Sequence, residues 1–412
     1  MSGLKIPYSC GKVGFFKTML ILLFVAIGTT GYGRATNAIA AVLMVLIAPQ
    51  LTFNYKTIYD RKSMNAFFIY FAMIFIIGFN CPDLYYHIGT NIAWTLCMFF
   101  PLFVSISVTN NYSNTERLLL LLSIAWFTLV IYSIYVFSFA EMGGRSFAQE
   151  NRGVAIGGGY PVAYGSALLM SVLLAAVRAK KVSKKLFPWV ITAVIVSGIH
   201  VIATQSFITI ISALMGSLIA LLISNPNVKN KKRRMIISFC FLAVVAVLVL
   251  VYKKEIGLFL IGFSDLFEND IIKQRIEESG LYLYAGEETN HVGDRSATLE
   301  ASWKTFTEYP IFGVSYKVGN YFKGLQELGI GAHSEILDAF AKFGIIGSIP
   351  FFAIFVNFLK KMDFLYGSEI SFPLVCTLLM LVACNPFVSI QSLFMLFLYI
   401  PLVLKYFYND SY

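Results

Sequence analysis

The feature that most constrains this chain is a succession of apolar stretches, each about 17 to 25 residues long, joined by short polar connections. Hydrocarbon offers no hydrogen-bond partner to backbone amides, so a stretch that crosses a bilayer is expected to be a helix. Only 13% of the residues are charged and 58% are hydrophobic, which excludes a soluble protein with a single core. The pattern therefore predicts an all-α polytopic membrane protein.

About twelve stretches fit a transmembrane helix. They lie at 14–31, 36–53, 64–80, 89–108, 118–140, 160–177, 187–203, 206–224, 235–252, 333–359, 370–385 and 389–408. The two halves of the hydropathy pattern do not match, so we expect a single membrane domain over residues 1–412. One long polar interruption, residues 253–332, separates the ninth span from the tenth.

The basic residues indicate the orientation of the spans. Lys and Arg gather in the connections at 178–186 and 225–234, as they do in cytoplasmic loops. Both termini are therefore expected in the cytoplasm, and the loops at 141–159 and 253–332 outside the membrane. The first apolar stretch shows no cleavage site and is expected to remain as an anchor. The net charge of +10 then reflects topology and does not favour a nucleic-acid partner.

Within the long loop, the segment SATLEASWKTFTEYP predicts an amphipathic helix over residues 296–309. Its apolar face would hold Leu299, Trp303 and Phe306, and its charged face Glu300, Lys304 and Glu308. Asp294 or Ser296 suits the N-cap, and Pro310 suits the end. We expect this helix to lie at the membrane interface, where a tryptophan buries its ring and keeps its N–H in water.

Arginines in the two outer loops run against the positive-inside trend. Arginine can hold a phosphate through two parallel hydrogen bonds without losing its charge. Arg295 stands at the start of the expected amphipathic helix, and Arg152 precedes the glycines at 157–159, where backbone can approach a ligand closely. Arg145, in the same loop as Arg152, is the weaker candidate. The alternative for each is a solvated loop cation.

The tenth span opens with a polar stripe of His333, Ser334 and Glu335, followed by Asp338 and Lys342 at helical spacing. An ionisable residue at the bilayer centre costs about 2.5 kcal/mol or more, so such residues usually face a cavity and indicate function. His333 is a candidate general base, because a neutral imidazole can accept a hydroxyl proton near neutral pH. A structural ion pair between Asp338 and Lys342 is the alternative for those two residues.

Four motifs occur in order along the chain: ENRGVAIGGGYPVAYG, ATQS at 203–206, DRSATLEASWKTFTEYPIFGV and AHSEILDAFAKFGIIG. With these motifs the chain resembles the superfamily of O-antigen ligases and O-antigen polymerases, which are glycosyltransferases of the bacterial envelope. The resemblance covers most of residues 150–350 and implies the GT-C-like ligase and polymerase fold. The first 140 residues match only as generic spans.

The resemblance implies an enzyme of the bacterial cytoplasmic (inner) membrane whose active site faces the periplasm. Such an enzyme moves an oligosaccharide from undecaprenyl pyrophosphate to a sugar hydroxyl by inverting transfer, with no metal or other cofactor. Carried over to this sequence, Arg152 and Arg295 match positions that hold the pyrophosphate, His333 matches the proposed base, and Glu335 would orient it. The implied partners are the lipid-linked donor and acceptor, membrane lipid and a protein that regulates chain length.

Two departures from the ligase pattern favour a polymerase of O-antigen, in lipopolysaccharide biosynthesis, or of a related surface polysaccharide. Phe207 stands where many relatives have an arginine, and Ser334 stands where many ligases have asparagine. His200 or Lys317, both expected on the outer side of the membrane, would then supply the missing cation. The alternative is a ligase that transfers the glycan to lipid A core. A lipid-linked glycan flippase or secondary transporter is a further alternative, although it should spread charged residues through several spans.

Overall fold

A computed structural model of the protein describes residues 61–80, 95, 99, 101–102, 112–139, 160–204, 206–224, 230–265, 270–286, 290–314 and 330–409. Every regular element within these ranges is a helix, in agreement with the expected all-α class. The spans expected at 14–31 and 36–53 lie outside the described residues. The span expected at 89–108 is described only at isolated positions.

Most of the expected spans are present as helices with similar bounds. In chain order these are α3 (Arg61–Asn80), α5 (Tyr112–Phe139), α7 (Tyr160–Arg178), α8 (Phe187–Ala203), α9 (Phe207–Ile223), α10 (Lys231–Val251), α14 (Glu335–Tyr366), α15 (Ser368–Cys384), and a final run of α16 (Ile390–Phe394), the π-helix η2 (Met395–Tyr399) and α17 (Ile400–Asn409). By length and composition, α7 and α14 are the two described helices that can cross a membrane, and shorter apolar segments of 10 to 17 residues lie within α3, α5, α8, α9, α15 and the final run. The total of about twelve spans stays a prediction.

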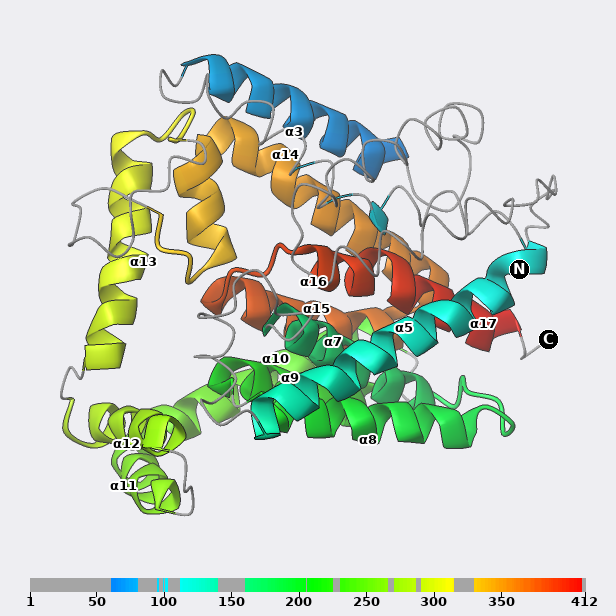
Figure 1. The fold of residues 1–412 in the computed structure, drawn as a ribbon, viewed down its shortest axis with the longest axis horizontal. Helices are drawn as coiled ribbons and strands as arrows, with labels where there is room; N and C mark the ends of the chain where they lie inside the picture. The colour runs from blue at the N-terminus through cyan, green and yellow to red at the C-terminus, as the bar shows by residue number, and fades with distance from the viewer. Residues whose placement is uncertain are drawn as a thin grey trace.

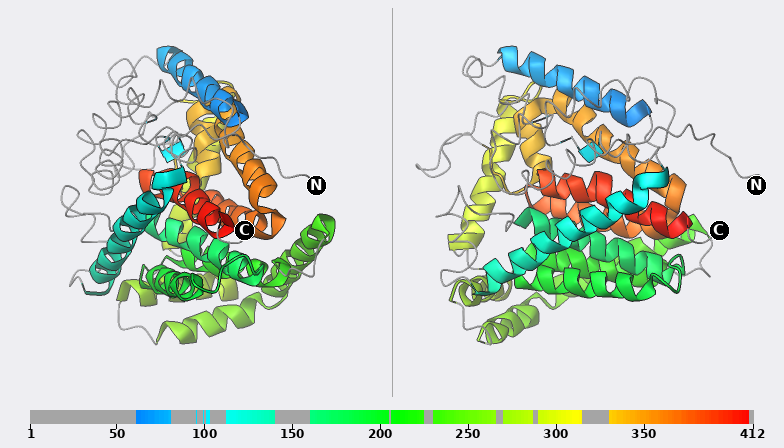
Figure 2. Two further views of the ribbon diagram at one scale, coloured as in Figure 1. Left: turned by 90° about the vertical axis from the view of Figure 1, so that its right-hand side faces the viewer. Right: turned by 45° about the vertical axis from the view of Figure 1, so that its right-hand side comes forward.

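The core of the molecule is built around α7, most of which is buried. It packs against α8, α9 and α15, and α5 crosses α8 obliquely (Figures 1 and 2). Small side chains permit this close packing: a Cβ at Gly165 would collide with the ring of Trp126, and one at Gly216 of α9 would collide with Thr377 of α15. Helix contacts through small residues are typical of membrane bundles.

A second part of the core is aromatic and lies where α3 runs along α14 (Figures 1 and 2). The ring of Tyr70 in α3 contacts those of Phe343 and Phe351, each with centroids 5.3 Å apart. Phe397 of η2 extends the cluster through Phe358, at 4.8 Å. These ring contacts fix the second part of α14 between α3 and the C-terminal helices.

Helix α14 is broken at Gly344, which has φ 56° and ψ −167°. The backbone groups freed by the break bond to residues 310–314, which we call the strap. Ile345 N donates to Pro310 O (2.8 Å), and Val314 N donates to Ala341 O (3.0 Å). The first part of α14 lies beside the long-loop helix α13 (Asn290–Glu308), and the second part lies beside α3 (Figure 1).

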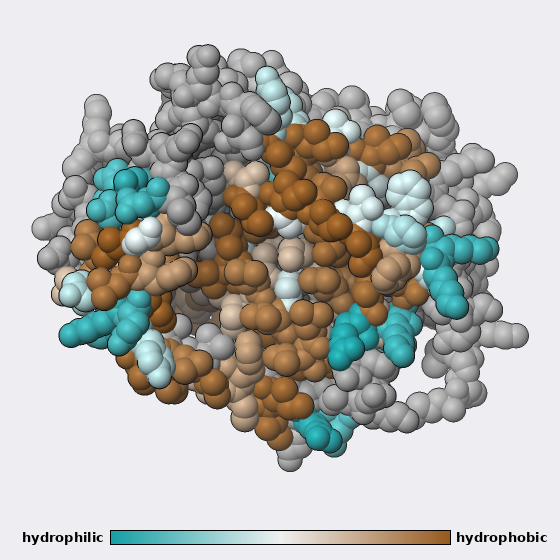
Figure 3. Space-filling model, turned by 90° about the horizontal axis from the view of Figure 1, so that it is seen from below, coloured by the Kyte–Doolittle hydropathy of each residue, from teal (hydrophilic) through white to brown (hydrophobic). Residues whose placement is uncertain are grey.

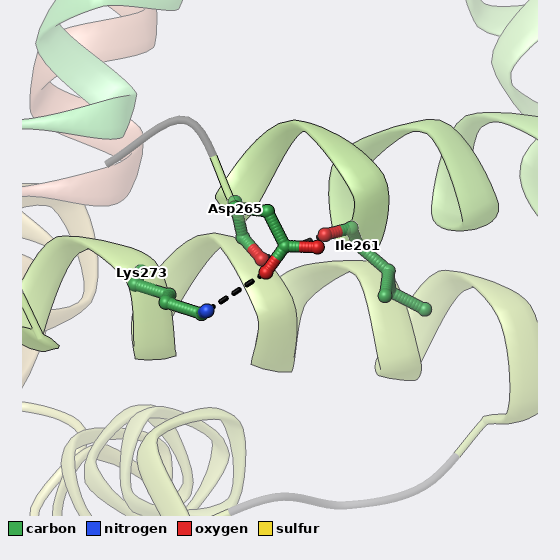
Figure 4. A network of polar contacts seen from close by, with 4 residues as sticks. Ile261, Asp265 and Lys273 are labelled. Atoms are coloured by element: carbon green, nitrogen blue, oxygen red, sulfur yellow. Dashed lines mark hydrogen bonds and ion pairs between the residues drawn. The ribbon is translucent and has the colours of Figure 1, made fainter. Parts of the chain in front are cut away.

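The long loop expected at 253–332 is largely helical in the part that the structure describes. It contains α11 (Lys253–Ser264), α12 (Asp270–Ala285) and α13. A Cβ at Gly257 would meet Gly280 O at 2.7 Å and the converse also holds, so α11 and α12 cross at two glycines. An exposed ion pair, Lys273 Nζ to Asp265 Oδ1 at 2.7 Å, joins the two helices (Figure 4). These helices therefore form a closely packed hairpin.

One side of the molecule is apolar. Seen from below, it presents a broad hydrophobic face with hydrophilic side chains gathered toward the edges (Figure 3). Helix α8 runs along this side (Figure 1), and α8 and α10 both expose large apolar side chains, among them Ile195, Ile199, Val247 and Leu250. An apolar face of this kind fits contact with lipid chains.

Candidate functional site

The polar stripe predicted at the start of the tenth span lies at the N-terminus of α14. Ser334 caps this helix: its backbone is extended and its Oγ accepts a hydrogen bond from Leu337 N at 3.4 Å. Serine is a favoured cap because its hydroxyl satisfies one of the free amides of the first turn. The cap leaves His333 just outside the helix, partly exposed, while Glu335 and Asp338 are buried in the first turn.

Glu335 anchors the start of α14 to the connection between α15 and α16. Its Oε2 accepts a hydrogen bond from Val388 N at 2.8 Å, and its own amide donates to Asn385 O at 3.0 Å. Lys342, two turns further along α14, interacts electrostatically with the Glu335 carboxylate. The role of Glu335 in orienting His333 stays a prediction.

Asp338 is buried, with 1% of its surface exposed, and connects α14 to α13. Its Oδ1 accepts hydrogen bonds from Ser302 Oγ (2.6 Å) and from Ala332 N (3.2 Å). The Ser302 hydroxyl in turn accepts a hydrogen bond from Gly331 N at 2.6 Å. A hydroxyl and an amide are therefore partners of Oδ1, and the alternative of an ion pair between Asp338 and Lys342 stays a prediction.

Helix α13 differs in two respects from the helix expected at 296–309. It begins at Asn290, so Asp294 and Ser296 lie inside it instead of at the N-cap. Its buried side chains include Ser302 and Thr305, whereas Trp303 is 53% exposed. The helix thus packs on α14 through a face with small hydroxyl side chains, which the apolar pattern alone did not reveal.

The remaining parts of the expected faces of α13 are recognisable. The charged side chains of Glu300, Lys304 and Glu308 are exposed. Phe306 packs against Phe340 of α14, with ring centroids 5.2 Å apart. The exposed Trp303 ring contacts Phe306 at 5.6 Å. This aromatic edge suits the interfacial location expected from the sequence.

The structure describes only one of the predicted pyrophosphate-binding arginines. Arg295 is a residue of α13, seven positions before Ser302 and hence on the same helical face. Arg145, Arg152 and Lys317 lie outside the described residues. Within those residues, no three His, Cys, Asp or Glu side chains are grouped as metal ligands would be.

His200 occupies a buried position between three helices. Its Nδ1 is hydrogen-bonded to Ser166 Oγ of α7 (2.8 Å) and its Nε2 to Ser133 Oγ of α5 (2.9 Å). We expected His200 at an outer surface, able to replace the missing arginine, but both of its ring nitrogens are used in packing α8 against its neighbours. We therefore do not assign it to the pyrophosphate site.

The structure thus brings His333, Glu335 and Asp338 together at the start of α14, against the helix that contains Arg295. The sequence reasoning missed Ser302 and the backbone of residues 385–388. The available signal for Ser302 was a serine beside the aromatic residues of an amphipathic helix, and serine in a helix is too common to single out. The backbone contacts at 385–388 left no side-chain signal.

Comparison with known proteins agrees with the resemblance seen in the sequence. Residues 191–352 match the family model described as O-antigen ligase. This range contains the three long-loop helices, the strap and the first part of α14, including Arg295, Ser302 and His333. A search of curated proteins found no match. Over residues 191–352 the chain is therefore similar to the O-antigen ligase family.

Proposed function

We propose that this protein is a membrane glycosyltransferase that moves a glycan from undecaprenyl pyrophosphate to a sugar hydroxyl, and that it acts as a polymerase of O-antigen or a related surface polysaccharide. One observation carries the proposal. His333, partly exposed, stands at the capped start of α14, and buried Asp338 in the first turn of α14 is bonded to Ser302 of α13, the helix that contains Arg295. All of these residues lie within the match to the O-antigen ligase family.

In the proposed reaction His333 accepts the proton of the acceptor hydroxyl, whose oxygen attacks the anomeric carbon of the donor sugar. The bond from that carbon to the pyrophosphate oxygen breaks, and the configuration at the carbon inverts. Arg295, with Arg152 and Arg145 from the other outer loop, neutralises the charge that develops on the departing lipid pyrophosphate. A pyrophosphate leaves without an acid, so the mechanism needs no second carboxyl group of the glycosidase kind.

The partial exposure of His333 supports this assignment. A base has to reach its substrate, whereas the groups that fix it can be buried. In the structure His333 is partly exposed, while Ser334, Glu335 and Asp338 next to it are buried. We place this site on the periplasmic side of the cytoplasmic membrane, with both termini in the cytoplasm, because the basic connections at 178–186 and 225–234 indicate that orientation.

Phe207 and Ser334, where many ligases have arginine and asparagine, favour the polymerase over the ligase. The polymerase uses a second lipid-linked repeat unit as acceptor, and the ligase uses a lipid A core sugar. The transporter alternative is less well supported, since the buried carboxylates of the described spans gather at one place, the start of α14. A chain-length regulator remains a proposed partner.

The test is glycan synthesis by purified protein in liposomes that contain undecaprenyl-pyrophosphate-linked repeat units, with and without lipid A core. We expect a ladder of products from the donor alone. We also expect His333→Ala to lower the rate at least about 100-fold, as the loss of a general base does. Lys304→Ala, an exposed charge on α13, is the matched control and should leave the rate unchanged.

Three results would contradict the proposal in different ways. Product only in the presence of core would replace the polymerase by the ligase. Labelled lipid that crosses the bilayer without any product would favour transport. An active His333→Ala protein would leave the transferase assignment intact and remove His333 as the base.

A further inference from the structure

We propose that Ser302 is a positioning residue that sets the place of His333 relative to α13, the helix of the donor-binding Arg295. This inference rests on the proposed glycosyl transfer. Ser302 is 1% exposed, and its hydroxyl is used twice. It accepts a hydrogen bond from Gly331 N and donates one to Asp338 Oδ1, each at 2.6 Å.

Asp338 completes the arrangement, which we call the Ser302–Asp338 latch. Its Oδ1 also accepts a hydrogen bond from Ala332 N at 3.2 Å. The two backbone amides that directly precede His333 are therefore both bound to the latch. The bond from Gly331 N to Ser302 Oγ is buried, so water would not replace it, and a buried donor without a partner costs about 1 to 3 kcal/mol.

The backbone held by the latch has an uncommon conformation. Ala332 has φ 47°, in the left-handed region that costs a residue with a Cβ roughly 1 to 2 kcal/mol. A conformation of this kind persists only where surrounding contacts hold it. The described hydrogen bonds of the Gly331 and Ala332 amides both go to the latch, so the latch holds this turn.

The turn also lies directly on α13. A Cβ at Gly331 would collide with the carbonyl oxygen of Thr298, one turn before Ser302. Arg295, Thr298 and Ser302 are three and four residues apart and share one face of the helix. Residues 331–333 therefore lie on the face of α13 that includes the position of Arg295. That position is about 10 Å from Ser302 along the helix axis, toward the start of the helix.

This geometry gives the latch a function in the proposed reaction. The base and the cation act on opposite sides of the same anomeric carbon, so their separation has to match the substrate. A misplacement of about 1 Å can lower a rate about 100-fold. Ser302 fixes that separation because it lies on the helix of Arg295 and binds the backbone of the His333 segment.

The experiment compares Ser302→Ala and Ser302→Thr in liposomes with the lipid-linked donor, measuring kcat and KM separately. We expect Ser302→Ala to lower kcat about 10- to 100-fold with KM for the donor changed less than roughly threefold. Ser302→Thr keeps the hydroxyl and should recover most of the rate. Thr307→Ala removes an exposed hydroxyl of the same helix and is the control, with no expected change.

Hydrogen–deuterium exchange supplies a measurement that does not depend on activity. Ser302→Ala removes the latch, so the amides of Gly331 and Ala332 should exchange faster in that variant. In Thr307→Ala the latch is intact, and the two amides should exchange as slowly as in the wild type. Where Ser302→Ala does not fold, Asp338→Asn takes its place, because asparagine keeps an acceptor near Oδ1 and loses the charge.

Normal kcat in Ser302→Ala, or exchange that does not change, would overturn the inference. A fall in activity that only follows the loss of folded protein, with no recovery in Ser302→Thr, would also overturn it. If the wild-type protein forms no glycan product, the proposed function fails, and the exchange rates of residues 331–332 then decide separately whether the latch holds the turn.

Discussion

Replacing Gly344 by alanine should destabilise the protein strongly, because the break in α14 needs a residue without a side chain. The backbone there, at φ 56° and ψ −167°, lies in a region that is essentially restricted to glycine, and forcing another residue into it costs about 1 to 3 kcal/mol. A Cβ would also collide with the carbonyl group of Ile311 and approach Phe312 N to 2.6 Å.

The collision with the strap adds to that cost. Moving residues 310–312 away would break the bonds from Ile345 N to Pro310 O and from Ile346 N to Ile311 O. Ile345 and Ile346 are exposed, so each lost hydrogen bond costs about 0.5 to 1.5 kcal/mol. We expect a total of about 3 kcal/mol, which for a chain of 412 residues corresponds to a fall in Tm of about 3 to 4 °C.

The assay is thermal unfolding of purified protein in detergent, with Gly262→Ala as the matched control. Gly262 is in α11, is exposed, and would place its Cβ in open space. Alanine is favoured over glycine in a helix by up to about 1 kcal/mol, so the control should be as stable as the wild type or slightly more stable. A Gly344→Ala protein that melts within about 1 °C of the wild type would refute the reasoning.

The other predictions concern side chains outside the proposed site. His200→Ala should lower stability by about 2 to 5 kcal/mol, because it opens a cavity and leaves Ser133 and Ser166 without their partner, while activity per folded molecule stays within roughly threefold. A large loss of activity in folded His200→Ala protein would return His200 to the site. Lys273→Ala should change the free energy of unfolding by less than about 1 kcal/mol, because both partners of the Lys273–Asp265 pair are exposed. Denaturation in detergent measures both effects, and a larger change for Lys273→Ala would mean that the pair is not an ordinary surface contact.

The helices were predictable where the signal is local. Hydropathy depends on residues that follow one another, so the expected bounds 187–203 agree with α8 and the bounds 160–177 agree closely with α7. The break in α14 was not predictable, because Gly344 lies within an apolar stretch. Its conformation depends on the strap, some thirty residues earlier in the chain.

The residues of the candidate site likewise include some that were predictable from the sequence and some that were not. Glu335 and Asp338 were recognisable as ionisable residues at the start of a span. Ser302 was not, because its partner Asp338 lies 36 positions away and nothing in the helix pattern connects them. His200 was expected at an outer surface because the expected topology ends the seventh span there, but serines from two other helices bind its ring, and such a contact is a property of the folded bundle.

The pairing of the strap with the broken helix implies an order of assembly during biosynthesis. Hydrocarbon cannot satisfy the amides that the break at Gly344 sets free, so they require protein carbonyls when α14 enters the bilayer. Those carbonyls belong to Pro310 and Ile311, which the ribosome makes before Gly344. In the proposed orientation the strap is therefore already across the membrane when α14 is inserted, and the helix can enter as two pieces that dock on a partner made in advance.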